Sequence, residues 1–278
     1  MPQGSSQVFL RWRASWRGKL SRVVEETLTR VLEPRLAEIE QRAEHRHQEV
    51  LRALTAWERR QRRDVMTAME QEAARGSAEL VRREMSAVSW HFHPHATLLD
   101  ALRQAPDSGL VLEFGVASGT TLRLLADHRA GRPVFGFDSF EGLPERWRLG
   151  FDAGTFATDA LPDVPGADLV VGWFADVLPD FLAQHPGPVA LLHVDCDLYS
   201  STRTVLEHVG PRLAVGSVVV FDEFYNYPGW QEHEHRAWGE YAKSAGLSFE
   251  YLGITMDDEQ VSVRVTGLAS PRADRAAT

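Results

Sequence analysis

Cysteine and long apolar runs are scarce in this chain of 278 residues. The single cysteine, Cys196, excludes a disulfide within the chain, and its two acidic neighbours oppose formation of a thiolate. No apolar run reaches the roughly 18 residues of a membrane span, and the N-terminus lacks the charged-then-apolar pattern of a signal peptide. We therefore expect a soluble, cytoplasmic protein with an unreactive thiol.

Glycine and proline are almost missing from Leu20 to about Val88, where Pro34 is the only proline. Arg, Glu, Gln and Ala dominate this segment, and its apolar residues recur every three or four positions. The spacing drifts, so it favours a long amphipathic helix, broken near Pro34, over a strict coiled coil. We expect residues 1–88 to form a helical extension that packs on the rest of the protein or joins copies of the chain into a homo-oligomer.

The formal net charge of -9 is unevenly distributed. Residues 1–88 hold 17 Lys and Arg against 13 acidic residues, whereas the remainder holds 13 against 26. Basic and acidic residues interleave along the helical segment and acids dominate elsewhere, so we expect no nucleic-acid partner. An anionic membrane surface ranks below assembly as a role for the extension, and would use aromatic and basic residues near the N-terminus: Trp12, Trp16, Arg11, Arg13, Arg17 and Lys19.

Short apolar runs alternate with helix-like stretches after residue 108. Five runs predict strands buried on both faces: LVLEFG (110–115), PVFGFD (133–138), ADLVVGWF (167–174), PVALLHVD (188–195) and GSVVVFDEF (216–224). Two further runs, SFEYLGIT and QVSVRVTG, alternate apolar with polar residues and predict a closing hairpin. The pattern indicates an α/β fold over residues 89–270, with a doubly wound, mostly parallel sheet of seven strands, followed by a disordered tail at 271–278.

The first predicted strand runs into LEFGVASGTT, which places Glu113, Gly115 and Gly119 in the order acid-x-Gly-x-x-x-Gly. Glycine lets the backbone approach a ligand, and the helix that opens near Thr120 directs its amides toward it. The dinucleotide pattern Gly-x-Gly-x-x-Gly is absent, and an acidic residue at this place would repel a pyrophosphate. The turn therefore favours a ligand with an ammonium group.

Asp138 closes the second predicted strand, and Ser139 follows it. A carboxylate at this place can accept hydrogen bonds from both ribose hydroxyls, which we favour over a capping role in the turn DSFEGLP. Gly172 and Trp173 end the third strand, where an adenine ring would lie. Trp173 either stacks on that ring or belongs to the core.

These features fit S-adenosylmethionine better than NAD, and residues 110–265 resemble class I S-adenosylmethionine-dependent methyltransferases. Three motifs carry a narrower resemblance to the macrocin O-methyltransferase family, which methylates sugars of macrolide and related antibiotics: FGFDSFEGLP (135–144), LLHVDCDLYSST (191–202) and VVVFDEFYNYPG (218–229). The resemblance does not extend to residues 1–88. It implies S-adenosylmethionine as cofactor and a small-molecule acceptor, a sugar or glycosylated natural product.

Carboxylates gather where the fourth and fifth predicted strands end. Asp195 ends the fourth strand, and Asp222 and Glu223 end the fifth, so all three converge if the strands are neighbours. Without a cation they would repel one another, whereas Mg²⁺ prefers such oxygen ligands. The resemblance implies Asp195, Asp222 and Glu223 as metal ligands, although Glu223 stands where the family would have Asp.

A base must take the proton of the acceptor hydroxyl, and Asp195 at the strand tip is our first candidate. Asp197, His233 and His235 are alternatives, while Asp197 more simply caps the next turn. His193 lies two residues before Asp195 on the same strand. It is either a core residue or a partner of the site, and core is the commoner role of such a histidine.

Two smaller expectations complete the site. We expect Ser200 or Ser201 to cap the helix that follows the fourth strand. Four aromatic residues near residue 230 form either a wall for the substrate or part of the core: Tyr225, Tyr227, Trp230 and Trp238.

Three functions remain open on the sequence. The first is an O-methyltransferase that acts on a sugar or other small natural product. A non-catalytic scaffold that only retains the cofactor is the second. An NAD-dependent reductase is the third, and it is disfavoured because a Gly-x-Gly turn and a Tyr-x-x-x-Lys pair are absent.

Overall fold

The computed structural model describes residues 16, 19, 21–129 and 131–269. The expected disordered tail at 271–278 lies outside the described residues, as do Trp12 and the arginines at 11, 13 and 17. The chain divides into two compact units between Ala68 and Met69. Within the described part of the chain, each helix is too short or too polar to cross a lipid bilayer.

The N-terminal segment is helical, but its break is not at the proline. A π-helical turn, η1 (Leu28–Leu32), runs directly into α2 (Glu33–Arg63), and Pro34 lies in the first turn of α2. A proline costs little there, because the first helical N–H groups have no partner within the helix. The prediction of a break near Pro34 is therefore wrong.

The break lies at Asp64, which separates α2 from α3 (Val65–Glu84). Asp64 is extended, and its Oδ1 accepts hydrogen bonds from the amides of Met66 at 2.9 Å and Thr67 at 3.5 Å. An aspartate in this role satisfies amides that the first turn leaves free. Helix α3 buries Ala73, Ser77 and Leu80 and belongs largely to the second unit, whereas the sequence grouped it with the extension.

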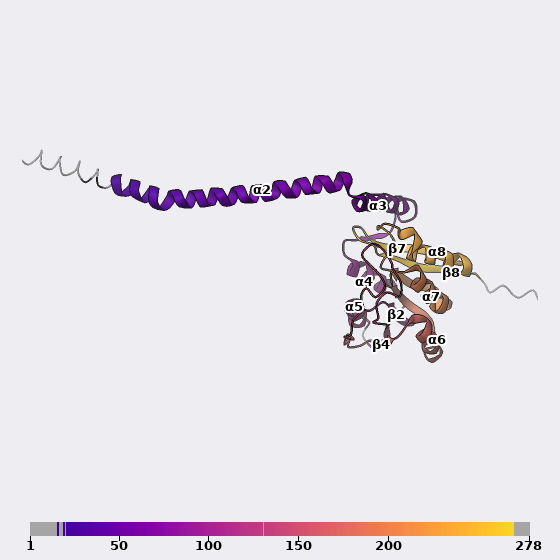
Figure 1. The fold of residues 1–278 in the computed structure, drawn as a ribbon. Coiled ribbons are helices and arrows are strands. Elements are labelled where there is room, and N and C mark those ends of the chain that lie inside the picture. Colours follow the sequence, from indigo (N-terminus) through magenta and orange to yellow (C-terminus); the bar gives the residue numbers. More distant parts are fainter. Residues whose placement is uncertain (1–15, 17–18, 20, 130, 270–278) are drawn as a thin grey trace, which may run out of the picture. The chain divides into compact units, whose positions relative to one another are not determined.

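The second unit is built on one mixed sheet of eight strands, in the order β1-β7-β8-β6-β5-β2-β3-β4 (Figure 1). The strands are β1 (Ser89–His91), β2 (Leu110–Phe114), β3 (Val134–Asp138), β4 (Asp168–Val171), β5 (Val189–Val194), β6 (Leu213–Phe221), β7 (Leu247–Thr255) and β8 (Val261–Leu268). Strand β8 runs antiparallel to β6 and β7, and the remaining pairs are parallel. The expected hairpin is confirmed as β7 and β8.

The count of seven strands is wrong by one, because β1 adds a parallel edge strand beside β7. It has three residues, SWH, too few to show an apolar run or an alternation. Strand β4 is shorter than predicted and ends at Val171, because Phe174 already begins a helix.

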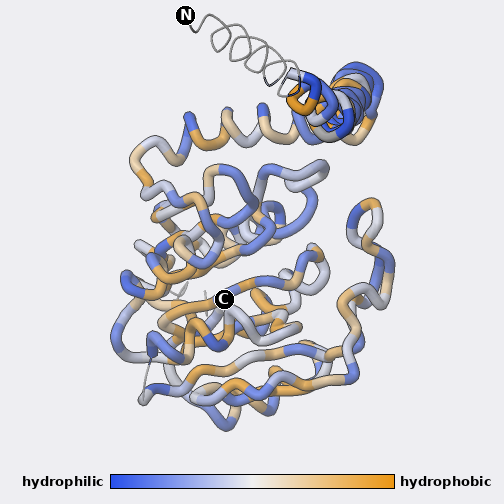
Figure 2. Tube along the Cα trace, turned by 90° about the vertical axis from the view of Figure 1, so that its left-hand side faces the viewer, coloured by the Kyte–Doolittle hydropathy of each residue, from blue (hydrophilic) through white to orange (hydrophobic). Residues whose placement is uncertain are grey.

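Helices cover both faces of the sheet. On one face lie α4 (Pro94–Gln104) and α5 (Thr120–His128), and on the other α6 (Phe174–Gln184), α7 (Tyr199–Val209) and α8 (Glu234–Ala245) (Figure 1). Two short 3-10 turns, η2 (Gly210–Arg212) and η3 (Trp230–Glu232), complete the elements. The helices bury apolar side chains against the strands. Figure 2 colours the chain by hydropathy and shows hydrophobic stretches along the strands.

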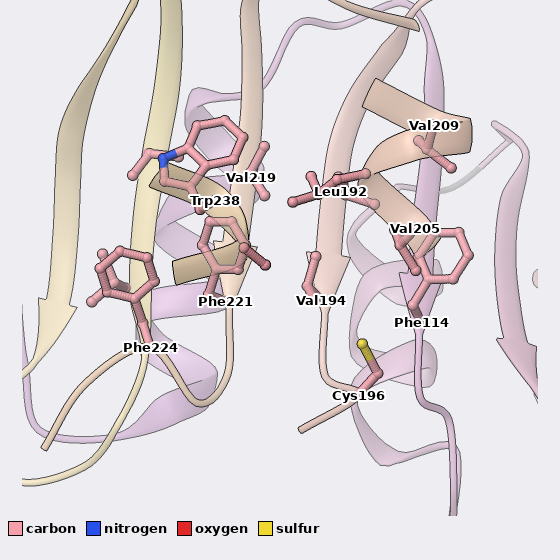
Figure 3. Close-up of a cluster of buried hydrophobic side chains, with 14 of the residues drawn as sticks. Phe114, Leu192, Val194, Cys196, Val205, Val209, Val219, Phe221, Phe224 and Trp238 are labelled. Atoms are coloured by element: carbon pink, nitrogen blue, oxygen red, sulfur yellow. The ribbon is translucent and has the colours of Figure 1, made fainter. Parts of the chain in front are cut away.

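Side chains of successive strand residues alternate between two apolar clusters, one beneath each helical layer. Leu192, Val194 and Phe221 pack under α7 and α8 together with Val205 and Trp238 (Figure 3). Residues on the other side of the same strands, such as Val111 and Val220, belong to the cluster under α4 and α5. Strands buried in this way on both faces read as continuous apolar runs, which is why the sequence revealed them.

The register of the central strands decides which chain segments meet at their carboxyl ends. The amide of Asp195 donates to the carbonyl of Phe114 at 2.8 Å, and the amide of Asp222 donates to that of Val194 at 2.9 Å. Strand β5 therefore brings the ends of β2 and β6 to its two sides. The sheet order reverses between β2 and β5, and open α/β sheets bind ligands at such a point.

The turn after β2 tolerates only glycine at residue 115. Gly115 has φ +94°, and a Cβ there would overlap the carbonyl oxygen of Asp195. We expect Gly115→Ala to lower the free energy of unfolding by more than about 4 kcal/mol, because backbone strain and a clash with another strand end combine. Urea unfolding followed by circular dichroism measures the change.

Gly150→Ala is the matched control, because Gly150 has φ +90° and open space where its Cβ would lie. Its free energy of unfolding should fall by only about 1 to 2 kcal/mol, the cost of placing an alanine in a left-handed conformation. Equal losses in the two variants would contradict the clash between β2 and β5.

Candidate active site

A cavity of about 250 Å³ opens at the carboxyl ends of the central strands. Segments that follow β2, β3, β5 and β6 supply its floor, and the crossover between β3 and β4 supplies much of its wall. Six of the predicted site residues line it: Gly115, Asp138, Ser139, Trp173, Asp195 and Glu223. The sheet thus collects at one place residues that lie more than one hundred positions apart.

Asp138 organises the glycine turn. Its Oδ2 accepts hydrogen bonds from the amides of Val116 at 2.8 Å and Ala117 at 2.9 Å, and its Oδ1 accepts one from Phe140 at 2.8 Å. Ala117 has φ +43°, an unusual conformation for a residue with a Cβ. The carboxylate therefore fixes the turn after β2 and still borders the cavity.

Glu113 does not line the cavity, because its side chain is fully buried below it. Its Oε2 lies 2.9 Å from Nδ1 of His193, and its Oε1 accepts a hydrogen bond from Thr121 at 3.1 Å. The two residues are direct neighbours in the β2–β5 register. An ammonium group of a ligand could contact this carboxylate only if Glu113 gave up its contacts with both His193 and Thr121.

The remaining predicted cofactor residues, Gly119, Thr120 and Gly172, are not among the residues that line the cavity. Gly119 begins α5 at φ +75°, and a Cβ there would press on Pro162 and Val164. Thr120 is exposed, and its hydroxyl pairs with that of Ser118 at 2.9 Å. Gly172 supports the end of β4 through a bond from its amide to the Asp138 carbonyl at 2.9 Å.

A compact group of metal-ligating atoms lies where β5 and β6 end. One ligand atom from each of His193, Asp195 and Asp222 lies within 4.8 Å of the others. Burial raises the pKa of Asp195 well above its usual value, and the charge of Asp222 raises it further. Burial acts in the same direction on Asp222, but the nearby imidazole of His193 outweighs it and lowers the pKa of Asp222.

His193 joins the two carboxylates that flank it. It is fully buried, with Nδ1 against Glu113 and Nε2 at 3.7 Å from Oδ1 of Asp222, too far for a normal hydrogen bond. Burial alone would lower the pKa of His193, but Asp222 and Glu113 outweigh it and hold the pKa well above its usual range. Both sequence interpretations of His193 thus apply, since it is a core residue and also a partner of the site.

Glu223 lines the cavity but stands outside that compact group. Burial raises its pKa well above the usual value, followed by the charge of Asp222, and its Oε2 has no hydrogen-bond partner among the described residues. Its amide donates to Oε2 of Glu234 at 3.0 Å. Sequence reasoning missed Glu234, a fully buried carboxyl in the first turn of α8, because no strand end pointed to it.

The donor set fits a divalent cation. Asp195 and Asp222, which are half-buried, and the buried Glu223 are called the carboxylate cluster here, and the unpartnered Oε2 of Glu223 is free to bind a cation. His193 is a poor ligand, because Nδ1 is held by Glu113 and its raised pKa favours the protonated ring. Carboxylates alone as donors favour Mg²⁺ or Mn²⁺ over zinc.

Of the proposed bases, the structure brings only the aspartates to the cavity. Asp197 lines it in a left-handed conformation, φ +62°, and burial raises its pKa to about 7 against the lowering effect of Arg148. His233 and His235 are not among the lining residues, and burial lowers the pKa of both.

The predicted caps of α7 are wrong. The helix begins after Leu198 without a side-chain cap, so neither Asp197 nor a serine has that role. Ser200 instead donates to Glu145 on the β3–β4 crossover at 2.5 Å, and Ser201 borders the cavity.

The aromatic wall of the cavity comes from a segment that sequence reasoning passed over. Tyr225, Tyr227, Trp230 and Trp238 are buried core residues and do not line the cavity. Trp147, Phe151 and Phe156 of the β3–β4 crossover do, together with Trp173 and Phe174. Their irregular spacing gave no periodic signal.

Arg148 holds that crossover against the β7–β8 turn. Its guanidinium lies 3.8 Å from the ring centre of Trp147, and Nη1 donates to both oxygens of Glu259 at 3.0 and 3.2 Å. Arg148 is also the one basic residue among those that line the cavity. The cavity therefore combines an aromatic wall, one cation and several carboxylates.

Comparison with known proteins is consistent with this geometry. Residues 112–224 match a family described as a methyltransferase domain. The 8-demethyl-8-(2,3-dimethoxy-alpha-L-rhamnosyl)-tetracenomycin-C 4'-O-methyltransferase of Streptomyces olivaceus is 29% identical over 147 residues, covering 42% of this chain and 53% of that protein. The mycinamicin III 3''-O-methyltransferase of Micromonospora griseorubida is 35% identical over 83 residues, covering 30% of each.

Both matches leave much of the relatives outside the comparison, since the chain spans 53% and 30% of their lengths. Among solved structures, a calicheamicin methyltransferase is 28% identical with a TM-score of 0.48, over 61% of this chain and 76% of that one. Residues 112–224 are thus similar to a methyltransferase domain, and the chain is similar to O-methyltransferases that are named for natural products.

Proposed function

We propose that the protein is an S-adenosylmethionine-dependent O-methyltransferase that acts on a hydroxyl of a sugar or glycosylated natural product. The observation that carries the proposal is the cavity itself, where the glycine turn with Asp138 faces the same space as Asp195 and Glu223 of the carboxylate cluster, while Asp222 lies outside its lining. A methyl donor on one side and an acceptor hydroxyl on the other would then meet within it. Holding two reactants in this way supplies much of a transfer reaction's rate.

The donor would lie across the end of β2. Gly115 permits close approach of its backbone, Asp138 and Ser139 suit ribose hydroxyls, and Trp173 offers a face for the adenine ring. Glu113 and Gly119 support this arrangement from below, and Thr120 and Gly172 flank it. Glu113 acts in our proposal through His193 and the turn rather than by direct contact.

The acceptor would lie against the β3–β4 crossover. Trp147, Phe151 and Phe156 give it an apolar face, and Arg148 offers hydrogen-bond donors beside them. A sugar ring has both apolar C–H faces and polar edges, so it matches such a wall. The two curated relatives are named for O-methylation of glycosylated natural products, which agrees with this acceptor class.

Asp195 is the proposed base. It lies at the tip of β5, and burial together with Asp222 raises its pKa toward the range in which a carboxylate accepts a proton at neutral pH. Asp195, Asp222 and Glu223 would hold Mg²⁺, which when bound lowers the pKa of a hydroxyl beside it. The imidazole of His193 lowers the pKa of Asp222, which favours its charged form, and it helps to orient that carboxylate.

We further propose that the N-terminal helices join copies of the chain. No residue of α2 is buried within the described structure, and its apolar residues are exposed. A non-catalytic scaffold would need no carboxylate cluster, and an NAD-dependent reductase would need a different turn after β2. Transfer of label from S-adenosylmethionine to free sugars or glycosylated macrolides, with NADH-dependent reduction assayed beside it, tests the three functions.

The cofactor assignment predicts that the protein binds S-adenosylhomocysteine and that Asp138→Asn weakens this binding. The substitution removes an acceptor for ribose and loosens the turn at Val116 and Ala117, so we expect a loss of about 1.5 to 3 kcal/mol. Isothermal titration calorimetry measures it. Asp195→Asn serves as control and should bind within about threefold of wild type, a difference of less than 1 kcal/mol. No heat with the wild-type protein at millimolar ligand would refute the assignment.

The metal assignment predicts the opposite pattern for the same two variants. Mn²⁺ binding, followed by electron paramagnetic resonance, should fall at least about tenfold in Asp195→Asn and Glu223→Gln, because each removes a charged ligand. Asp138→Asn removes a carboxylate from the same cavity and should leave Mn²⁺ affinity nearly unchanged. Unaltered binding in Glu223→Gln would exclude Glu223 as a ligand, and a wild-type protein without Mn²⁺ affinity would refute the site.

A further inference from the structure

Helix α2 carries an apolar stripe that is exposed within the first unit. Leu36, Ile39, Val50, Leu54 and Trp57 are between 55% and 59% exposed. Helices are held in proteins mainly by burial of such a stripe, and isolated ones are marginal in water. A contiguous exposed stripe of this length therefore marks an interaction surface.

The stripe is straight enough to serve one partner along its length. With Ala43, its members are spaced by three, four or seven residues, and at 3.6 residues per turn they all project within about 40° of Ala43. The interval from Ala43 to Val50 spans Arg46 and His47, which project at the edges of the stripe. A second helix could follow this line for more than six turns, roughly the distance from Glu33 to Trp57.

Charge is largely sorted between the two flanks of the stripe. On one flank, about 60° to 100° from Ala43, lie four glutamates and one arginine: Glu33, Glu40, Glu44, Glu58 and Arg62. On the other flank, at similar angles of opposite sign, lie four arginines: Arg35, Arg42, Arg46 and Arg60. Two ion pairs among the described residues of α2 involve these flanks, Arg42 with Glu38 and Arg62 with Glu58, and both are exposed and so contribute little.

The charges on the two flanks favour a second copy of α2 as the partner, and they favour a parallel over an antiparallel pair. When two identical helices pair in parallel, the left flank of one faces the right flank of the other, so glutamates would meet arginines. In an antiparallel pair each flank faces its own copy, so acids would meet acids and bases would meet bases. We infer that two copies of this chain associate through a parallel pairing of α2, with the stripe buried between them.

Sedimentation equilibrium of the full chain gives the first test. We expect a mass twice the 31.2 kDa of one chain. The double variant Ile39→Asp, Leu54→Asp should raise the dissociation constant of the dimer more than tenfold, because both charges would lie within the buried stripe. Ala56→Asp is the matched control on the outer face of α2 and should stay dimeric. Unchanged S-adenosylhomocysteine affinity in the monomeric variant would show that the second unit remains folded.

Cysteine cross-linking decides direction, since the native Cys196 is buried. Leu36→Cys and Leu54→Cys should each form a covalent dimer with itself on mild oxidation. Mixing a tagged copy of one variant with an untagged copy of the other should add no mixed species. Mixed species without self-linked dimers would show an antiparallel pair and overturn the inference. A wild-type chain that sediments as a monomer would also overturn the inference. The same holds for a monomer that cosediments with phosphatidylserine vesicles.

Discussion

The register of β5 between β2 and β6 is the constraint on which the site depends. Two backbone hydrogen bonds, from Asp195 to Phe114 and from Asp222 to Val194, fix how far each strand end projects. The close passage of Gly115 past the Asp195 carbonyl follows from the same register. A shift of one residue would turn every side chain of β5 to the other face and separate the carboxylates from the glycine turn.

Burial of several carboxylates in one place is the main electrostatic cost of this arrangement. Asp195, Asp197, Glu223 and Glu234 all have raised pKa values, with burial as the first cause in each. His193 offsets part of the cost, because its imidazole lies between Glu113 and Asp222. Groups kept together at this cost, beside a cavity, are typical of a functional site rather than of a stabilising core.

The two units of the chain differ in how much of their apolar surface is buried. In the second unit, helices on both faces of the sheet bury the central strands β2 and β5 completely, and Figure 3 shows Phe221 and Trp238 packed together. The expectation that β4 is buried on both faces is wrong, because this edge strand is partly exposed. In the first unit, α2 buries none of its residues within the chain. An apolar stripe of this length is stabilised when it is covered, and the proposed pairing of α2 would supply that cover.

Sequence alone determined the fold class and most strands. Strands that are buried on both faces appear in the sequence as runs of apolar residues, and these runs end at glycines or acidic residues. Asp138, Asp195 and Glu223, which the sequence puts at strand ends, line the cavity, since parallel strands end at one edge of a sheet. Tertiary structure decided the rest: the pairing of Glu113 with His193, the role of Glu234, the break at Asp64 and the aromatic wall from Trp147 to Phe156. These depend on strand register, helix packing and the path of an irregular crossover, and contacts between residues far apart in sequence leave no periodic signal along the chain.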